Sequence, residues 1–139
     1  MKKGFYKKKD IALLFIRLTV GGILFLNHGL EKLINYKEML EWFPDPFLIG
    51  NIPGFVFAFI ADVIGSLLLV LGFKTKIASC LILANLLFAL VFVHHFNILE
   101  IHGELIVCYL VSLGLLWISG NGKISLDQYF FKPTDSSVQ

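Results

Sequence analysis

Charge is scarce in this sequence of 139 residues, because Lys, Arg, Asp and Glu together make up only 16% of it. A soluble domain of this length buries about 70% of the surface of its unfolded chain and covers much of the remainder with charged groups. Here 57% of the residues are hydrophobic and the mean hydropathy is +0.79. The composition therefore excludes an ordinary soluble domain and predicts an integral membrane protein.

Several other features are missing. There are no runs of Ser, Gly or Gln, no tandem repeat and no linker, so residues 1–139 are expected to form one domain. The glycine patterns of phosphate and dinucleotide sites and of nucleophile elbows are absent. The two cysteines, Cys80 and Cys108, form no CxxC pair. On helices they would differ in depth by well over ~10 Å, whereas a disulfide needs Cα atoms within about 7 Å, so we do not expect thiol exchange.

Four long apolar runs are present instead. A bilayer core about 30 Å thick is crossed by roughly 20 apolar residues in a helix, and backbone groups in lipid must be satisfied within their own segment. None of the runs alternates polar and apolar residues as a barrel strand would. The sequence therefore predicts an all-α fold, an integral membrane four-helix bundle with spans at residues 11–30, 55–73, 77–93 and 101–119.

The lysines predict the orientation of these spans. Only Lys32 and Lys37 lie on one side, between the first two spans, whereas nine lie on the other: Lys2, Lys3, Lys7, Lys8, Lys9, Lys74, Lys76, Lys123 and Lys132. Cytoplasmic loops carry the excess of basic residues, so we expect both termini in the cytoplasm of a bacterial inner (plasma) membrane. The basic start resembles a secretory leader, but the apolar run after it is too long and lacks a small-residue cleavage site. We expect it to be retained.

Residues 31–54 connect the first two spans and are too many for a tight turn. Apolar residues recur at helical spacing among charged ones, at Leu33, Tyr36, Leu40 and Phe43. This pattern is typical of an amphipathic segment in the outer headgroup region, with an ordered loop packed on the bundle as the alternative. Pro44, Pro46 and Pro53 are expected to break the chain before the second span.

Two ionisable residues, Arg17 and Asp62, lie inside the expected spans. Each costs about 3 kcal/mol at the middle of a membrane on insertion scales, so both should face the bundle interior or water. The helical rise leaves an offset of roughly 10 Å between them along the membrane normal, which an arginine side chain can largely bridge. A structural ion pair, an Arg17 that snorkels towards the cytoplasm and a functional role all fit this pattern.

Each expected span also has one face of small or polar residues. In chain order these faces are Arg17, Gly21 and His28; Ala58, Asp62 and Ser66 beside Ala61 and Gly65; Ala78, Asn85 and Ala89; and Glu104, Cys108 and Ser112. Small residues let helices approach closely in a membrane. The pattern favours a compact bundle with these faces turned inward.

The histidines gather at the outer end of the expected bundle, at His28, His94, His95 and His102, near Glu31, Glu100 and Glu104. Such a cluster can bind a metal or carry protons. No fixed ligand spacing such as HExxH is present, however, and polar residues are ordinary where helices meet water. We therefore expect no metal site.

The residues in this order resemble the DoxX family of small four-span bacterial membrane proteins, from about residue 11 to residue 127. The family pattern is matched by Arg17, Gly21, Gly22, His28, Gly29 and Lys32, then by Asp62, Gly65, Ser66, Gly72, Lys74, Thr75, Lys76 and Ala78, and then by Gly103 and Glu104. Its terminal Gly-x-Gly-[KR]-x-Ser-Leu-Asp signature is matched by residues 120–127. Asp62 stands where the family usually has Glu, and Ser66 where it has a second Gly.

The resemblance implies a function linked to membrane redox systems. DoxX-type subunits accompany a terminal quinol oxidase or a thiosulfate:quinone oxidoreductase, or join oxidative-stress complexes. We therefore expect an accessory subunit of a quinone-linked redox complex that is not catalytic by itself. Arg17, His28, Asp62 and Glu104 would line an outer polar pocket able to hold a quinone head group.

Two other functions stay open. Distant relatives act as assembly chaperones, so the protein is alternatively a non-catalytic assembly factor or scaffold whose small-residue faces dock client helices. A small-solute carrier is a further alternative, although the paired broken helices of many transporters are lacking. The expected partners are the lipid bilayer and other membrane-protein subunits, with a homo-oligomer as another arrangement. Nucleic acid is not expected, because the excess of positive charge is confined to a terminal cluster.

Overall fold

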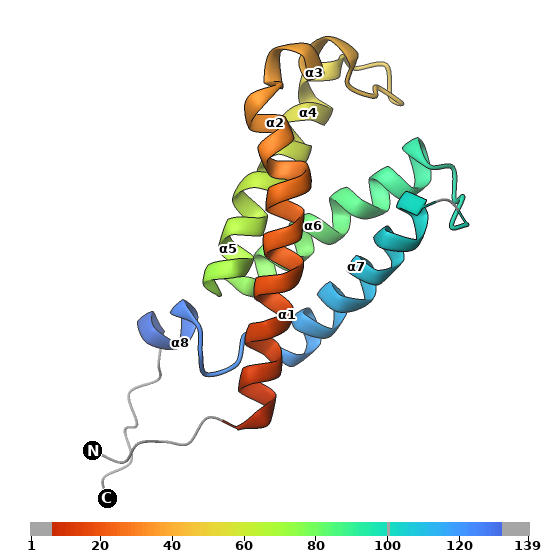
Figure 1. Ribbon diagram of the computed structural model, residues 1–139. Helices are drawn as coiled ribbons and strands as arrows, with labels where there is room; N and C mark the ends of the chain where they lie inside the picture. Colours follow the sequence, from red (N-terminus) through yellow and green to blue (C-terminus); the bar gives the residue numbers. More distant parts are fainter. Residues whose placement is uncertain (1–6, 100, 132–139) are drawn as a thin grey trace, which may run out of the picture.

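The computed structural model describes residues 7–99 and 101–131, apart from the side chains of residues 101 and 102. Within this part of the chain the structure is all-helical, without a strand. A first long helix runs continuously from α1 (Lys8–Leu24) through a π-helical turn, η1 (Phe25–Gly29), into α2 (Leu30–Ile34) (Figure 1). It continues past Leu30, where the first span was expected to end.

A short surface helix, α3 (Tyr36–Trp42), follows and has no buried residue. After the 43–50 loop, the second long helix consists of α4 (Asn51–Phe59), the π-helical turn η2 (Ile60–Gly65) and α5 (Ser66–Leu71). The expectation that Pro53 precedes this helix is wrong, because Pro53 lies in its first turn. Proline is tolerated there since the first backbone N–H groups of a helix have no partner within it.

The third long helix consists of α6 (Thr75–Phe88) and the π-helical turn η3 (Ala89–Val93). The fourth, α7 (Ile101–Ser119), has the bounds of the fourth apolar run, and a short helix, α8 (Leu126–Phe130), follows it. In Figure 1, α6 and α7 run side by side and diverge from the end that carries α2 and α3.

The core lies where the long helices meet, since α1 packs on α5 and α7, and α6 packs on α7 and η2. Its fully buried apolar side chains are Leu24, Leu69, Ile82, Leu113 and Leu116. The predicted inward face of the second span is confirmed, because Ala58, Ala61, Asp62, Gly65 and Ser66 are all buried.

The fourth helix turns a different face to the core than the sequence predicted. Glu104 and Cys108 are exposed, whereas Ile106, Tyr109, Leu113 and Leu116 are buried. The Ser112 hydroxyl donates to the Cys108 carbonyl oxygen at 2.8 Å. Its polar group is therefore satisfied within its own helix and does not require the interior.

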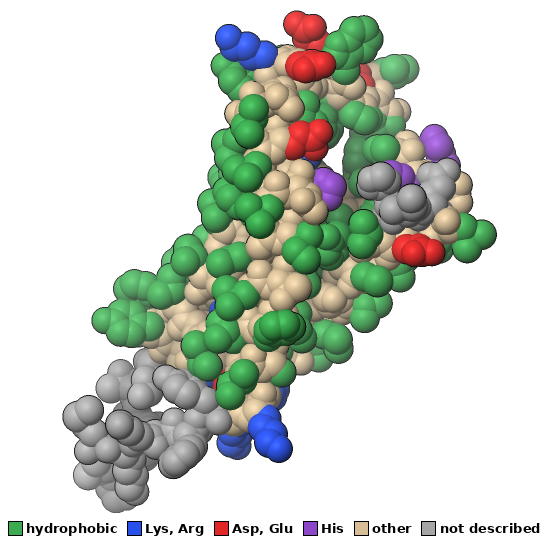
Figure 2. All heavy atoms as spheres, in the orientation of Figure 1, with side chains coloured by type: hydrophobic (Ala, Val, Ile, Leu, Met, Phe, Trp, Pro, Cys, Tyr) green, Lys and Arg blue, Asp and Glu red, His purple; other side chains and the backbone are tan. Residues whose placement is uncertain are grey.

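The surface between the two ends of the molecule is mostly apolar. Figure 2 shows hydrophobic side chains along the flanks of the helices, with Lys and acidic side chains concentrated at the ends. Within the described residues, the stretches Lys8–Ile34, Asn51–Leu71 and Thr75–Val93 are long and apolar enough to cross a membrane, and Gly103–Ser119 is a shorter apolar helix.

Candidate functional site

A cavity of about 180 Å³ lies between the diverging ends of the long helices. Its polar lining consists of His28, Lys32, Asp62, Asn85, His94 and Tyr109, and apolar side chains complete the wall. On the face seen in Figure 2 the surface is hollowed between the end that carries α2 and α3 and the ends of α6 and α7. We call this site the polar cavity.

All three π-helical turns of the described chain border the polar cavity. His28 belongs to η1, Asp62 to η2, and Ala89 and Val93 to η3. A π-helical turn is rare, disrupts the regular α-helical hydrogen bonding, and occurs frequently at functional sites. Three helices thus depart from regular geometry at the place where they jointly line a cavity.

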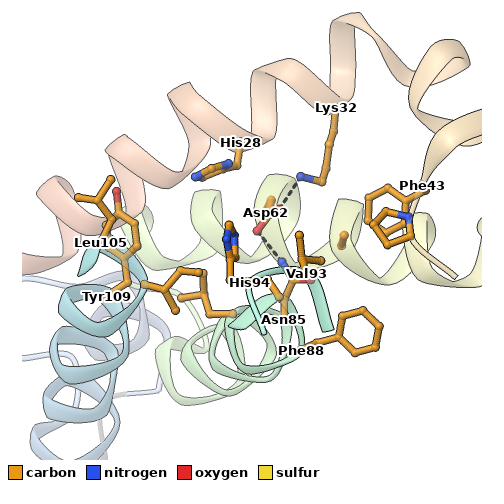
Figure 3. A pocket seen from close by; sticks show the side chains of 15 residues that line it. His28, Lys32, Phe43, Asp62, Asn85, Phe88, Val93, His94, Leu105 and Tyr109 are labelled. Carbon is orange, nitrogen blue, oxygen red and sulfur yellow. Dashed lines mark hydrogen bonds and ion pairs between the residues drawn. The ribbon is translucent and has the colours of Figure 1, made fainter. Parts of the chain in front are cut away.

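A buried polar network crosses one wall of the cavity (Figure 3). The Lys32 Nζ lies 2.8 Å from the Asp62 Oδ2, and the exposed fractions of these side chains are only 8% and 6%. The Asn85 amide donates to the Asp62 Oδ1 at 2.9 Å. Both carboxylate oxygens of Asp62 are therefore engaged, which compensates for removing the charge from water.

Helix geometry explains how Lys32 reaches this network. His28 and Lys32 are four residues apart on the same continuous helix, so their side chains lie on one face. Gly29 lies between them, and a Cβ at that position would be 2.8 Å from the Asp62 carbonyl oxygen. The absence of a side chain at Gly29 lets η1 approach η2 closely enough for the ion pair.

The chemistry of the cavity suits a compact neutral group that both donates and accepts hydrogen bonds. The charges of Lys32 and Asp62 cancel, Asn85 supplies an amide, and His28 and His94 supply imidazoles, which have both donor and acceptor nitrogens. Figure 3 shows His28 and Lys32 entering from the first long helix, with His94 and Asp62 beside them. Within the described residues, no three His, Cys, Asp or Glu side chains are arranged to hold a metal ion; the His102 side chain and Glu100 lie outside them.

Arg17 lies elsewhere, so the ion pair between Arg17 and Asp62, one of the three alternatives that the sequence left open, is wrong. The Arg17 side chain is 1% exposed and its Nη2 donates to the Ile124 carbonyl oxygen. A Cβ at Gly72 would overlap the guanidinium group. Arg17 therefore joins the first helix to the segment after α7, away from the polar cavity, and the partner of Asp62 is Lys32.

The segment after α7 that Arg17 contacts is the terminal signature, residues 120–127. The Asp127 carboxylate accepts hydrogen bonds from the backbone N–H groups of Lys74 at 2.7 Å and Thr75 at 3.2 Å, at the start of α6. The Asp127 N–H donates to the Gly72 carbonyl oxygen at 3.0 Å. Asp10 accepts from the Lys123 N–H at 2.8 Å. These bonds give the signature a structural role at the α5–α6 turn.

Of the four predicted site residues, the structure brings only His28 and Asp62 together in the polar cavity. Arg17 belongs to the junction with Ile124, and the exposed Glu104 does not line the cavity. The sequence prediction of the site missed Lys32, Asn85 and Tyr109. Asn85 was already expected on an inward face, and the spacing of Lys32 from His28 is the signal that could have found it.

Comparison with known proteins gives the same family as the sequence pattern. The DoxX family model matches residues 12–95, which include all three π-helical turns. Over 132 residues the chain is 29% identical to an uncharacterized protein of Haemophilus influenzae, covering 91% of this chain and 96% of that protein. No solved structure matches the chain. Because the family model covers well over half of the sequence, the chain belongs to the DoxX family.

Proposed function

We propose that this protein is an accessory subunit of a quinone-linked redox or oxidative-stress complex, and that its polar cavity binds a quinone head group. The observation that carries the proposal is the buried network of Lys32, Asp62 and Asn85 in the cavity wall. Buried ionisable groups in an otherwise apolar helical protein are costly and commonly functional. His28 and Asp62 remain in the proposed site, and Arg17 and Glu104 leave it.

The proposed setting is the bacterial plasma membrane, with the four long helices forming a single transmembrane bundle. The apolar flanks of the molecule support this placement. The pairing of Lys32 with Asp62 strengthens the proposed orientation, because Lys32 no longer counts as a free positive charge on the outer side. Lys37 is then the one uncompensated lysine between the first two spans, against nine on the side of the termini.

The cavity has the hydrogen-bonding groups that both redox states of a quinone need. The Lys32 ammonium and the Asn85 amide are donors for a quinone carbonyl, whereas the Asp62 carboxylate is an acceptor for the hydroxyl of a hydroquinone. A bound quinone would supply two-electron redox chemistry. The His28 imidazole lines the same cavity and is the proposed proton acceptor for a bound hydroquinone. The volume of about 180 Å³ is below the ~300–1,000 Å³ typical of drug-sized ligands, so it suits the head group alone.

A non-catalytic assembly factor or scaffold is the second candidate, and one observation favours it. Two loops beside the cavity expose apolar side chains, with Leu48 90% and Leu99 91% exposed. Exposed apolar patches often mark protein or membrane interaction sites. This function requires a bound partner protein and no quinone.

A binding experiment separates the two candidates. Protein purified in mild detergent is titrated with decylubiquinone by calorimetry, and co-purified lipid and protein are identified by mass spectrometry. We expect binding to the wild type, at least about tenfold weaker binding to Asp62→Asn, and unchanged binding to the matched control Glu104→Gln. Equal binding by Asp62→Asn would contradict the proposed site. A retained partner protein without any quinone binding would favour the scaffold.

A further inference from the structure

A second chamber adjoins the polar cavity. It has a volume of about 190 Å³. Residues of the 43–50 loop line one part of it, and Phe57 and Phe88 line another. Its lining is rich in aromatic and proline side chains, whereas the wall of the polar cavity carries ionisable ones, so we call it the aromatic chamber. Four residues line both spaces: Phe43, Pro44, Asn85 and Phe88.

The residues of the shared wall place hydrogen-bonding groups on the side of the polar cavity and aromatic groups on the side of the aromatic chamber. Asn85 and Phe88 are three residues apart on α6 and therefore share a face of that helix. Asn85 directs its amide to Asp62 on the polar side, and Phe88 contributes its ring to the aromatic side. In Figure 3, Phe43 and Phe88 frame the end of the polar cavity beyond Asn85. A ligand that passes Asn85 would therefore go from hydrogen-bonding groups to aromatic ones.

Phe47 closes the aromatic chamber against the third helix. Its ring centroid lies 5.9 Å from that of Phe88 and 5.2 Å from that of Phe92. The loop is fastened internally by Asp45, whose carboxylate accepts from the N–H groups of Ile49 at 3.0 Å and Gly50 at 2.8 Å. The carboxylate that lines this chamber is thus occupied by its own loop, which leaves the chamber with an apolar character.

We propose that the aromatic chamber binds the apolar chain of an amphipathic ligand whose compact, neutral head occupies the polar cavity. This inference rests on the proposed function and names the ligand class of the same site. The head must be neutral because Lys32 and Asp62 already compensate each other. The chain is recognised by burial of its apolar surface against Phe47, Phe57 and Phe88.

The test uses two probes that differ only in the chain: decylubiquinone and the same benzoquinone head without its decyl group. Each probe is titrated into wild type and into Phe47→Ala. For each probe, the dissociation constant of Phe47→Ala is then divided by that of wild type. Partitioning of a probe into the detergent is common to both variants and cancels in this ratio. Phe130→Ala on α8 is the matched control, because Phe47 and Phe130 are 58% and 62% exposed and both replacements should fold.

We expect Phe47→Ala to weaken decylubiquinone binding about tenfold, the scale of one lost contact in an apolar pocket, and to leave the chainless probe unaffected. Phe130→Ala should change neither. Equal effects on the two probes, or no effect on either, would overturn the inference while the proposed function survives.

If the wild type binds neither quinone probe, the proposed function fails and the chamber is tested without a quinone. Monodecanoylglycerol, a neutral amphiphile, is then added and its retention is measured by native mass spectrometry. Greater retention by wild type than by Phe47→Ala supports the aromatic chamber as a chain site. Equal retention, or none, rejects it.

Discussion

The ammonium group of Lys32 lies 2.8 Å from the carboxylate of Asp62, and both side chains are almost completely removed from solvent. The two residues come from the first and second long helices, whose backbones meet at Gly29. A buried ion pair is stable only when its remaining hydrogen-bonding capacity is satisfied, and Asn85 does this for Asp62. The contact therefore joins two helices and at the same time places charge in the wall of a cavity.

Neutralising one member of this pair should cost more than neutralising both. Lys32→Gln and Asp62→Asn each leave a charge without its partner, so each should lower the free energy of unfolding in detergent by roughly 1–3 kcal/mol. The double variant should recover part of the loss, which a double-mutant cycle measures as a favourable coupling. Arg17→Gln combined with Asp62→Asn is the control and should be additive. Additive losses for Lys32 and Asp62 would rule out a stabilising pair.

Gly29 should be far less tolerant of a side chain than another glycine of the core helices. In Gly29→Ala the new Cβ would be 2.8 Å from the Asp62 carbonyl oxygen, so the helices must separate, at a cost of about 1–3 kcal/mol. Gly114→Ala is the matched control, because a Cβ there meets nothing within 4 Å. It should be neutral or stabilising by up to about 1 kcal/mol, since alanine favours helix. Thermal unfolding of both variants checks this, and similar shifts would contradict the close approach.

Asp127 should stabilise the start of α6 from a distance in the sequence. Replacing it by Ala removes the acceptor of the Lys74 and Thr75 N–H groups, and loss of such a helix cap costs about 0.5–2 kcal/mol. Gln128→Ala, at an exposed neighbouring position, should leave the unfolding temperature unchanged. An Asp127→Ala protein as stable as wild type would show that the terminal signature does not act through these hydrogen bonds.

Labelling with a membrane-impermeant maleimide tests the proposed orientation. Cys80 and Cys108 are free and exposed, and their replacement by Ala should leave stability nearly unchanged. In that background, Lys37→Cys should react from outside intact cells, and Lys76→Cys should react only after the membrane is opened. Both positions are exposed on the protein, so access depends on the side of the membrane alone. Labelling of Lys76→Cys in intact cells would show that the proposed orientation is wrong.

The lengths of the apolar runs predict where helices lie along the chain better than where they end or which face they bury. The run 101–119 is helical over its whole length. The first run ends at Leu30 by hydropathy, because charged residues follow, but helical hydrogen bonding does not depend on hydropathy and continues to Ile34. That continuation turns Lys32 from an expected loop residue into the partner of Asp62.

The rotation of each helix was predictable only in part. On the second helix small residues determine which face can approach a neighbour, and the prediction is confirmed there. On α7 the predicted face is wrong, because Ser112 satisfies its hydroxyl locally and the larger Leu113 and Leu116 fill the core instead.

The three π-helical turns have a consequence for how such a protein can diversify. Deleting one residue from η1, η2 or η3 would restore regular α-helical geometry there, because a π-helical turn accommodates about one residue more than an α-helical turn. The side chains at that turn, which line the cavity, would then change, while the Leu69, Ile82 and Leu113 packing and the facing of the rest of the helix stay in register. Insertions and deletions of single residues, as well as substitutions, are therefore a route by which this scaffold can acquire a new binding chemistry.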